Sequence, residues 1–380
     1  RAGGNAIDAA AAAVATLCVV EPCSTGVGGD AFALIWSADE QRLYGINASG
    51  PAPMGLTAEL VRGRGHATFP IRGGLPVTVP GAIRGWQLAL ERFGTMGLDT
   101  LLAQPIEYAR DGYPISMTIA QAWRNSTELL GRLPDSQRVW LPAGRSPRAA
   151  ELFRNPEFAA TLQVLAENGY DAFYVGEIAA QIAAAVRADG GLMTEEDLAG
   201  YRAEWVEPIT IEYRDGYSFH EIPPNGQGLA ALLALNIARG FDLRSIPYGS
   251  ADYYHVLIES MKLGFADAHA YIADPRQAPV PVEAMLSQRY TRDRRALINR
   301  ATALWPEPGQ PEAHGDTVYL TVADAAGNMV SWIQSLYMGF GSGITAGRTG
   351  IQLQNRGANF SLMHGHPNEA APGKRPYHTI

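Results

Sequence analysis

The sequence predicts an α+β fold in which helix layers cover a sandwiched sheet. Helical patterns fill much of the chain, and strand patterns with a period of two appear near its end. The 41 Gly and 25 Pro are spread along the 380 residues, which favours many turns over a coiled coil or a helical bundle. With 47% hydrophobic residues, the chain can bury a substantial core in one large domain or two smaller ones.

The first predicted element is a buried helix over the Ala-rich run at residues 5–20. This run is shorter than the roughly 20 apolar residues of a membrane span and contains Asp8, so we expect no membrane segment there. Thr194 and Asp197 have a spacing that resembles a helix-capping box. The other predicted helices cover residues 82–93, 98–111, 156–168, 178–188, 194–201, 228–239 and 250–271.

Strands are predicted at residues 31–36, in a hairpin at 209–222 and in a second hairpin at 317–336. The first hairpin turns at Gly216, a residue that readily adopts a positive φ. Ahead of the second hairpin, residues 300–315 are polar, rich in Pro and without periodicity, which predicts an exposed connector.

Charge and cysteine content exclude several functional classes. The chain has 30 Lys and Arg against 38 Asp and Glu, a net charge of −8 with no basic stripe, so we expect no nucleic-acid partner. Its two cysteines, Cys18 and Cys23, are too few for a disulfide framework or a four-thiolate metal site. A single bridge between them is left open.

Common cofactor motifs are also missing. The eight histidines include no His-Glu-x-x-His pattern, and there is no Gly-Lys-Ser/Thr phosphate loop. The glycines at 339–343 are not followed by a convincing helix or an acidic ribose partner, which argues against a dinucleotide site. Gly28-Gly29-Asp30 is interpreted as a helix-to-strand turn. We therefore expect neither a metal nor a cofactor.

The stretch that most suggests chemistry is His314-Gly315-Asp316-Thr317, where the connector meets the second hairpin. The Thr317 hydroxyl can attack the carbonyl of Asp316 and shift the acyl group from nitrogen to oxygen; hydrolysis of that ester then frees the α-amine of Thr317. Such an amine, with a pKa of about 8, can accept the proton of its own hydroxyl. A β-branched Thr that merely begins a strand is the alternative, and spacing alone favours it.

A set of motifs runs from the first residues to the last: Gly3-Gly4-Asn5-Ala6-Ile7-Asp8-Ala9-Ala10, Glu21-Pro22, Gly26-Val27-Gly28-Gly29, Val79-Pro80-Gly81, Asp316-Thr317, Asp324-x-x-Gly327-Asn328, Gly341-Ser342-Gly343-Ile344 and Pro372-Gly373-Lys374-Arg375-Pro376. In this order they resemble the γ-glutamyltranspeptidase family. The resemblance implies a four-layer αββα sandwich of the N-terminal-nucleophile hydrolases, made as a precursor that cuts itself. Residues 1–316 are then expected to form the large-subunit part of a single domain, and residues 317–380 the start of a small subunit that continues beyond this chain.

The resemblance also implies roles for individual residues. The cut falls between Asp316 and Thr317, and Thr317 becomes the nucleophile. In the family a hydroxyl residue eighteen positions downstream supports the nucleophile, and here that residue is Ser335. The family's Asp-Phe-Arg-Glu segment, whose arginine pairs with the carboxylate of a γ-glutamyl group, corresponds to Asn-Ala-Ser-Gly at residues 47–50, which has no arginine.

Other substrate-binding positions differ from the family pattern as well. Tyr337 replaces an Asn, Asn359 replaces the Asp that binds the α-amine, and His378-Thr379 replaces a pair of serines. Losing both charged partners should cost several kcal/mol in γ-glutamyl recognition. The replacements resemble the branch with oxamate amidohydrolase and the proteins labelled cephalosporin acylases. Oxamate carries a carboxylate next to its amide and no amine, so we expect Arg356 to bind such a carboxylate; the alternative is a surface arginine on a strand.

The sequence thus predicts an autoprocessing threonine amidohydrolase that cleaves a small, oxamate-like amide through an acyl-enzyme on Thr317. One alternative is a γ-glutamyl hydrolase or transpeptidase acting on glutathione-like substrates, and another is an unprocessed, non-catalytic homologue. The expected partners are the small amide substrate and the chain's own small subunit, in a heterodimer or a dimer of heterodimers. We expect a cytoplasmic protein; because the chain does not begin with Met, a lost signal peptide stays open.

Overall fold

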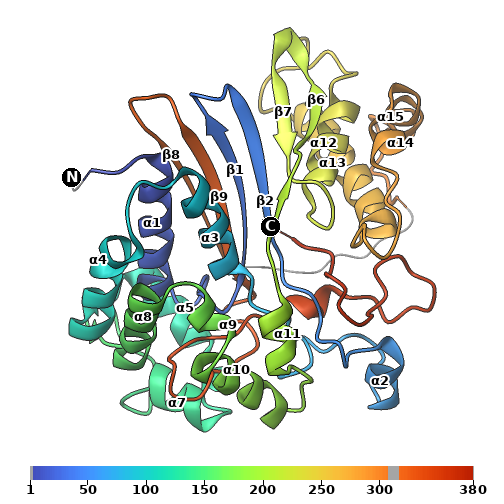
Figure 1. Cartoon of the computed structure of the whole chain (residues 1–380). Helices are drawn as coiled ribbons and strands as arrows, with labels where there is room; N and C mark the ends of the chain where they lie inside the picture. Colours follow the sequence, from blue (N-terminus) through green and yellow to red (C-terminus); the bar gives the residue numbers. More distant parts are fainter. Residues whose placement is uncertain (1–2, 307–315, 380) are drawn as a thin grey trace.

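A five-stranded antiparallel sheet forms the centre of the protein (Figure 1). The computed structural model describes residues 3–306 and 316–379, so most of the connector predicted at 300–315 lies outside the described residues. The strand order is β5-β2-β1-β9-β8. The strand bounds are β1 Asp30–Ser37, β2 Arg42–Ala48, β5 Glu204–Val206, β8 Asp316–Ala323 and β9 Met329–Tyr337.

The sheet joins the two ends of the chain through β1. This strand pairs with β2 on one side and with β9 on the other, and its first residue, Asp30, lies opposite Ser335. The strand predicted at 31–36 is confirmed as β1, and the hairpin predicted at 317–336 is confirmed as β8 and β9. The sheet therefore combines strands from both ends of the sequence. No period-two pattern predicts β2, because its residues from Tyr44 to Ala48 are all buried.

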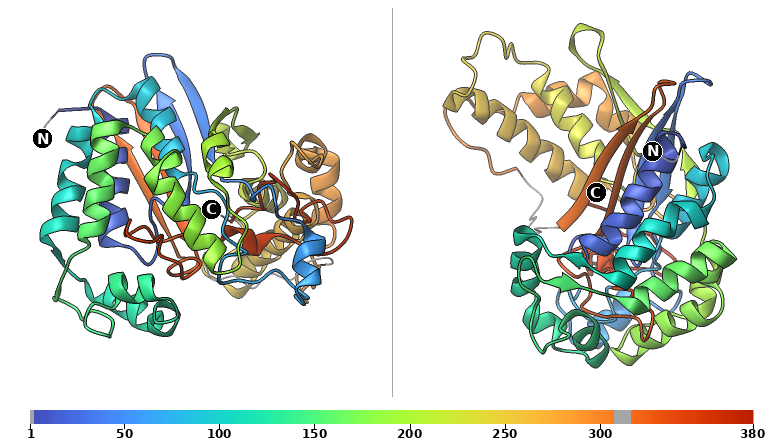
Figure 2. Two further views of the ribbon diagram at one scale, coloured as in Figure 1. Left: turned by 60° about the horizontal axis from the view of Figure 1, so that its bottom comes forward. Right: turned by 90° about the vertical axis from the view of Figure 1, so that its left-hand side faces the viewer.

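One face of the sheet is covered by helices, which Figure 2 shows on a single side of the strands. Helices α1 and α3 contact the sheet directly. Helix α4 packs against both α1 and α8. Their bounds are α1 Ala6–Val20, α3 Ala82–Phe93, α4 Leu98–Asp111 and α8 Pro156–Asn168. Across the described ranges, none of the helices combines the length and the apolar character needed to cross a bilayer.

The remaining helices and strands complete the fold. Most predicted helices appear within one residue of their expected bounds, and Thr194 and Asp197 do form a capping box. Gly216 has the expected positive φ of 80°. The remaining helices are α2 Ala58–Gly63, α5 Met117–Asn125, α6 Thr127–Leu130, α7 Pro134–Trp140, α9 Asp171–Tyr174, α10 Glu177–Ala188, α11 Glu195–Gly200, α12 Gly228–Ala238, α13 Ala251–Tyr271, α14 Val282–Leu286 and α15 Gln288–Arg295. Two small sheets pair β3 Tyr113–Pro114 with β4 Leu152–Phe153 and β6 Ile209–Glu212 with β7 Ser218–Glu221, and two 3-10 turns are η1 Arg214–Gly216 and η2 Arg356–Asn359.

The main hydrophobic core lies between the helix layer and the sheet. Trp86 from α3 and Trp332 from β9 are both fully buried there. The Gln334 side chain accepts a hydrogen bond from the Trp86 indole at 2.9 Å and donates one to the Cys18 sulfur at 3.1 Å. Cys18 and Cys23 are buried free thiols, so the bridge that the sequence leaves open does not form.

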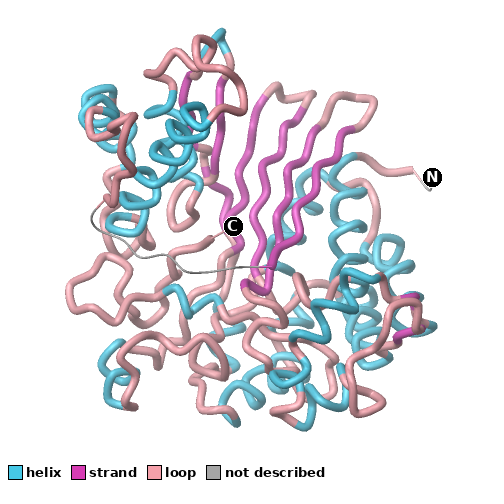
Figure 3. The backbone as a smooth tube through the Cα atoms, turned by 180° about the vertical axis from the view of Figure 1, so that it is seen from behind, coloured by secondary structure: helices cyan, strands magenta, loops and turns pink. Residues whose placement is uncertain are grey.

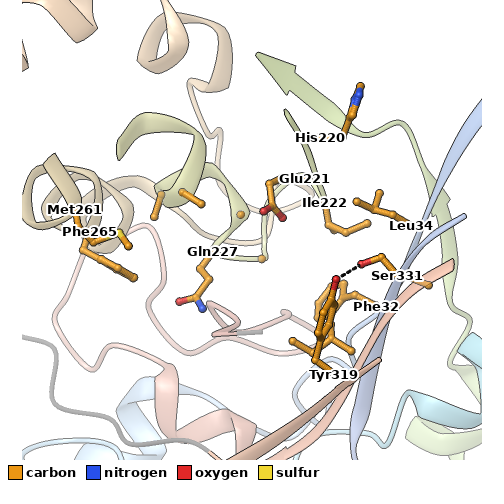
Figure 4. A pocket seen from close by; sticks show the side chains of 16 residues that line it. Phe32, Leu34, His220, Glu221, Ile222, Gln227, Met261, Phe265, Tyr319 and Ser331 are labelled. Carbon is orange, nitrogen blue, oxygen red and sulfur yellow. Dashed lines mark hydrogen bonds between the residues drawn. The ribbon is translucent and has the colours of Figure 1, made fainter. Parts of the chain in front are cut away.

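The opposite face of the sheet borders an open pocket of about 520 Å³. Figure 3 shows the strands side by side from this face, and Figure 4 shows the pocket between the sheet and α12 and α13. Phe32 and Tyr319 line it from the strands, and Met261 and Phe265 line it from α13. The described residues thus supply a helix layer, one sheet and a second group of helices. The pocket lies between these helices and the five-stranded sheet, and no second large sheet is formed by residues 3–306 and 316–379.

The N-terminus of α1 is fixed by a buried carboxylate. The Asn5 side chain caps the helix, and Asp8 completes the capping box by accepting from the Asn5 backbone amide at 2.9 Å. Asp8 is also the acceptor for the backbone amides of Thr95 and Met96, at 2.9 and 3.2 Å, and for the Thr95 hydroxyl at 2.5 Å. One side chain therefore closes the helix and attaches it to the segment between α3 and α4.

Replacing this carboxylate should destabilise the protein. We expect Asp8→Ala to lower the free energy of unfolding by about 3 kcal/mol, because several buried amide donors lose a charged acceptor. Urea unfolding followed by tryptophan fluorescence measures the change. Asp39→Ala, at an exposed turn position, is the matched control and should shift stability by less than about 0.5 kcal/mol. Equal stability of the two variants would contradict the role given to Asp8.

Candidate active site

Thr317, the predicted nucleophile, is the second residue of β8 and lies half-buried. Its hydroxyl donates a hydrogen bond to the Ser335 hydroxyl, with 3.1 Å between the oxygens. Asp316 pairs with Tyr337 and Val318 pairs with Gln334, so the register shifts by one residue at Thr317. This is a β-bulge, which places two residues of β9 opposite Thr317. The bulge brings Ser335 within hydrogen-bond reach of Thr317.

Ser335 is held in place from two directions. Its hydroxyl oxygen accepts the backbone N–H of Tyr337 at 2.7 Å. From the other side, the Gly28-Gly29 turn approaches so closely that a Cβ on Gly29 would lie 2.2 Å from the Ser335 carbonyl oxygen. Gly28 is equally restricted, since its Cβ would lie 2.2 Å from the Gln352 carbonyl oxygen. The glycine pair predicted as a turn is therefore also required for the close approach of three backbone segments.

The chain leaves β9 through a left-handed turn. Tyr337 has a φ of 83° and Phe340 a φ of 55°, values that non-glycine residues seldom adopt. The side chain of Asn355 accepts the Met338 backbone N–H at 3.2 Å and so supports this turn. As a result the Tyr337 ring is buried, and the Arg356 guanidinium lies over it at 4.4 Å. Such local strain is typical of functional sites.

Arg356 is 0% exposed, so the alternative of a surface arginine is wrong. Its Nη1 donates to the Thr379 hydroxyl at 2.8 Å, but Nε and Nη2 have no hydrogen-bond partner among the described residues. Burial lowers the pKa of Arg356 to about 10, with Asp30 and Tyr337 opposing the shift, so the group stays charged at neutral pH. A buried cation with two free donors is chemically suited to bind a carboxylate.

Asn359, at the end of η2, lies on the same short turn as Arg356. Its backbone carbonyl accepts the Asn368 side chain at 2.7 Å, and its own buried Nδ2 has no partner within the described ranges. The position therefore offers a neutral amide donor, whereas the family pattern has a carboxylate there.

His378, which the sequence places in the substrate-binding set, instead contacts Asp30, with 3.0 Å between Nε2 and the Oδ2 oxygen of Asp30. The other Asp30 oxygen accepts the backbone amides of Gly50 and Gly81 and the Gln354 side chain, at 3.0, 3.1 and 2.9 Å. Burial raises the pKa of Asp30 to about 7, against the opposing charge of Arg356. Burial and nearby cations lower the pKa of His378. Asp30 is the main site residue that the sequence analysis does not identify. The signal available in the sequence was an aspartate at the first position of an otherwise apolar strand.

Residues 47–50, where the family has its substrate arginine, form a neutral network. Asn47 donates from its side chain to Asn225 at 3.1 Å and accepts the Ser49 backbone N–H at 3.0 Å. Asn225 in turn donates to the Ser49 hydroxyl at 3.1 Å. The nearby Arg375 donates hydrogen bonds to the Ser49 carbonyl and to the Glu204 carboxylate, both at 2.9 Å. Arg356 is thus the better candidate for binding a substrate carboxylate.

Contacts link most of the predicted residues, and Asn359 and His378 join them as neighbours along the chain. Thr317 contacts Ser335, Ser335 contacts the backbone of Tyr337, and the Tyr337 ring contacts Arg356, which binds Thr379. Asp316 pairs through its backbone with Tyr337, Asn359 lies at the other end of η2, and His378 precedes Thr379. This arrangement combines a positioned hydroxyl with a buried cation.

Comparison with known proteins places the chain in a family. The profile described as gamma-glutamyltranspeptidase matches residues 1–380. The "Glutathione hydrolase-like YwrD proenzyme" of Bacillus subtilis is 39% identical over 379 residues, which cover 100% of this chain and 71% of that protein. The "Oxamate amidohydrolase proenzyme" of Klebsiella pneumoniae is 38% identical over 387 residues, covering 100% of this chain and 72% of that protein.

A solved structure agrees. The cephalosporin acylase from Bacillus halodurans is 48% identical and superposes with a TM-score of 0.93, covering 100% of this chain and 70% of that one. The fold is therefore the α+β fold of the N-terminal-nucleophile hydrolases, as the sequence predicts. The chain belongs to the γ-glutamyltranspeptidase family of hydrolases.

Proposed function

We propose that this chain is an autoprocessing threonine amidohydrolase that cleaves a small amide with an adjacent carboxylate, such as oxamate. The observation that carries the proposal is the buried Arg356 guanidinium, with two unpaired donors, in the same connected group as the Thr317 hydroxyl. The name of the Klebsiella pneumoniae relative supports this substrate class.

Self-cleavage comes first in this proposal. The Thr317 oxygen attacks the Asp316 carbonyl carbon, the peptide C–N bond breaks, and water hydrolyses the resulting ester, which leaves a free amine on Thr317. Residues 1–316 then belong to the large subunit and residues 317–380 begin the small one. Because β9 pairs with β1 along its length, the sheet would hold the two products together as a heterodimer. A cytoplasmic location is part of the same proposal.

The substrate reaction uses the same oxygen. The Thr317 hydroxyl passes its proton to the α-amine and bonds to the amide carbon of the substrate. The substrate C–N bond then breaks, and ammonia leaves with the proton that the amine returns. Water hydrolyses the acyl ester, which releases a second carboxylate and restores the hydroxyl. The role of Ser335 is to hold the Thr317 oxygen in the orientation needed for attack.

A γ-glutamyl substrate is the second candidate, favoured by the name of the Bacillus subtilis relative. Its ammonium group would need an acidic partner. Asn359 is neutral, and the Asp30 carboxylate already has four hydrogen-bond partners. These contacts favour a substrate without an amine.

The two candidate functions differ in the preferred substrate. We expect the full-length protein to release ammonia from oxamate faster than it releases aniline from a γ-glutamyl anilide.

Removing the proposed carboxylate ligand should weaken oxamate recognition. Arg356→Met should raise KM for oxamate about 30-fold, because a charged hydrogen bond contributes about 2 kcal/mol. Arg356→Lys, which keeps the charge and loses the planar fork, should be intermediate.

Arg289→Met, at an exposed position on α15, is the matched control and should leave KM unchanged. A faster reaction with the γ-glutamyl anilide would favour the second candidate. An unchanged KM for oxamate in Arg356→Met would remove Arg356 from the substrate site.

The contact between the two hydroxyls gives a separate prediction. Ser335→Ala should lower kcat about 10- to 100-fold with little change in KM, because the Thr317 hydroxyl loses its orienting partner. Steady-state kinetics on oxamate measures both constants. Ser331→Ala is the control on the same strand, since the Ser331 hydroxyl contacts Tyr319 at 3.1 Å beside the pocket. Equal kcat values for the two variants would argue against a role for Ser335.

A further inference from the structure

Asp30 and His378 form a fully buried acid–imidazole pair beside the proposed carboxylate site. Three donors converge on one Asp30 oxygen, and the other oxygen faces Nε2 of His378. The second ring nitrogen, Nδ1, is buried and has no hydrogen-bond partner among the described residues. The pair therefore has one nitrogen at which a further proton can bind.

The charges around this pair balance before a substrate arrives. With His378 neutral, the Asp30 carboxylate carries one negative charge and Arg356 carries one positive charge. Both side chains are completely buried, and they interact electrostatically. A substrate carboxylate at Arg356 would add a second negative charge to a region that excludes water. An uncompensated buried charge is costly, so the protein must either lose affinity or gain a proton.

We propose that the Asp30–His378 pair takes up one proton from solvent when a substrate carboxylate binds to Arg356. This inference rests on the proposed function, because it takes Arg356 as the carboxylate ligand. The proton enters at Nδ1 of His378, and the second proton of the pair stays in the hydrogen bond between Nε2 and the Asp30 carboxyl group, so the protonated pair carries no net charge. The buried charge is then the same before and after binding. Asp30 and His378 act through Arg356 and are positioning residues.

The other charged and titratable groups near the pair do not offer the same compensation. Arg375 cannot accept a proton, because it is already a cation and is paired with Glu204. Three tyrosines face the group from other elements, and burial raises the pKa of each, so they stay neutral: Tyr174 on α9, Tyr201 after α11 and Tyr337 on β9. The α-amine of a mature Thr317 is the one competing proton acceptor in the proposed mechanism, and the experiment must separate it from the pair.

Calorimetry on the mature wild-type protein tests the proposal directly. The probe is pyruvate, which has the shape of oxamate with a methyl group in place of the amide nitrogen. Titrations at about pH 8 in buffers of different ionisation enthalpy give the number of protons taken up per pyruvate bound. We expect about one proton to be taken up per pyruvate bound, and the Kd for pyruvate to rise about tenfold per pH unit above about pH 8.

Variants identify the group that takes up the proton. Asp30→Asn and His378→Gln should each reduce the uptake to near zero and remove most of the pH dependence of Kd, although both keep the Thr317 amine. Asp8→Asn makes the same change at a buried, multiply hydrogen-bonded carboxylate at the start of α1, and it should retain the wild-type proton number. A purely structural role for Asp30 would weaken binding at every pH without changing the proton number.

The outcomes separate this proposal from the one on which it rests. If pyruvate binds in an Arg356-dependent way without proton uptake, the proposal is wrong and the carboxylate site stands. It is also wrong if uptake persists in both Asp30→Asn and His378→Gln, because the proton then goes to another group. If pyruvate does not bind to the wild-type protein, the carboxylate site itself is wrong, and this proposal falls with it.

Discussion

The antiparallel pairing of β1 with β9 brings together residues that lie about 300 positions apart in the sequence. It sets Asp30 opposite Ser335, so the first strand of the chain carries the buried acid and its partner carries the hydroxyl that contacts Thr317. The pairing is possible only because Gly28 and Gly29 let three backbone segments approach closely. The bulge between β8 and β9 then places Thr317 against Ser335. Long-range strand pairing thus assembles the site.

Buried charge explains the composition of the site. The Arg356 side chain is completely buried, and its charge is compensated by electrostatic attraction to Asp30 and by the face of the Tyr337 ring. Asp30 is held in place by backbone amides, Gln354 and His378, and its carboxylate is the counter-charge of Arg356. The segment at 47–50 carries no charge and is closed by amide and hydroxyl contacts. In the proposed function the cation that binds the substrate carboxylate is Arg356 and not a residue of that segment.

Local signals predicted the elements, and long-range contacts decided the rest. The helices with caps, such as the one that starts after Asn5, appear where expected because a cap is formed by neighbouring residues. The spacing of Thr317 and Ser335 was available from the family resemblance, and their hydroxyls do lie 3.1 Å apart. The contact of His378 with Asp30 was not predictable, since it joins residues that are close only in the folded protein. The same holds for β2, whose burial removes the alternation that marks a strand.

The proposed function requires Thr317 to become a chain terminus. The most direct test is the intact mass of freshly purified full-length protein, together with N-terminal sequencing of its fragments. We expect two fragments that meet between residues 316 and 317, with the second starting Thr-Val-Tyr-Leu, and a single uncut chain for Thr317→Ala. A wild-type protein that stays uncut would contradict the account and support the non-catalytic homologue.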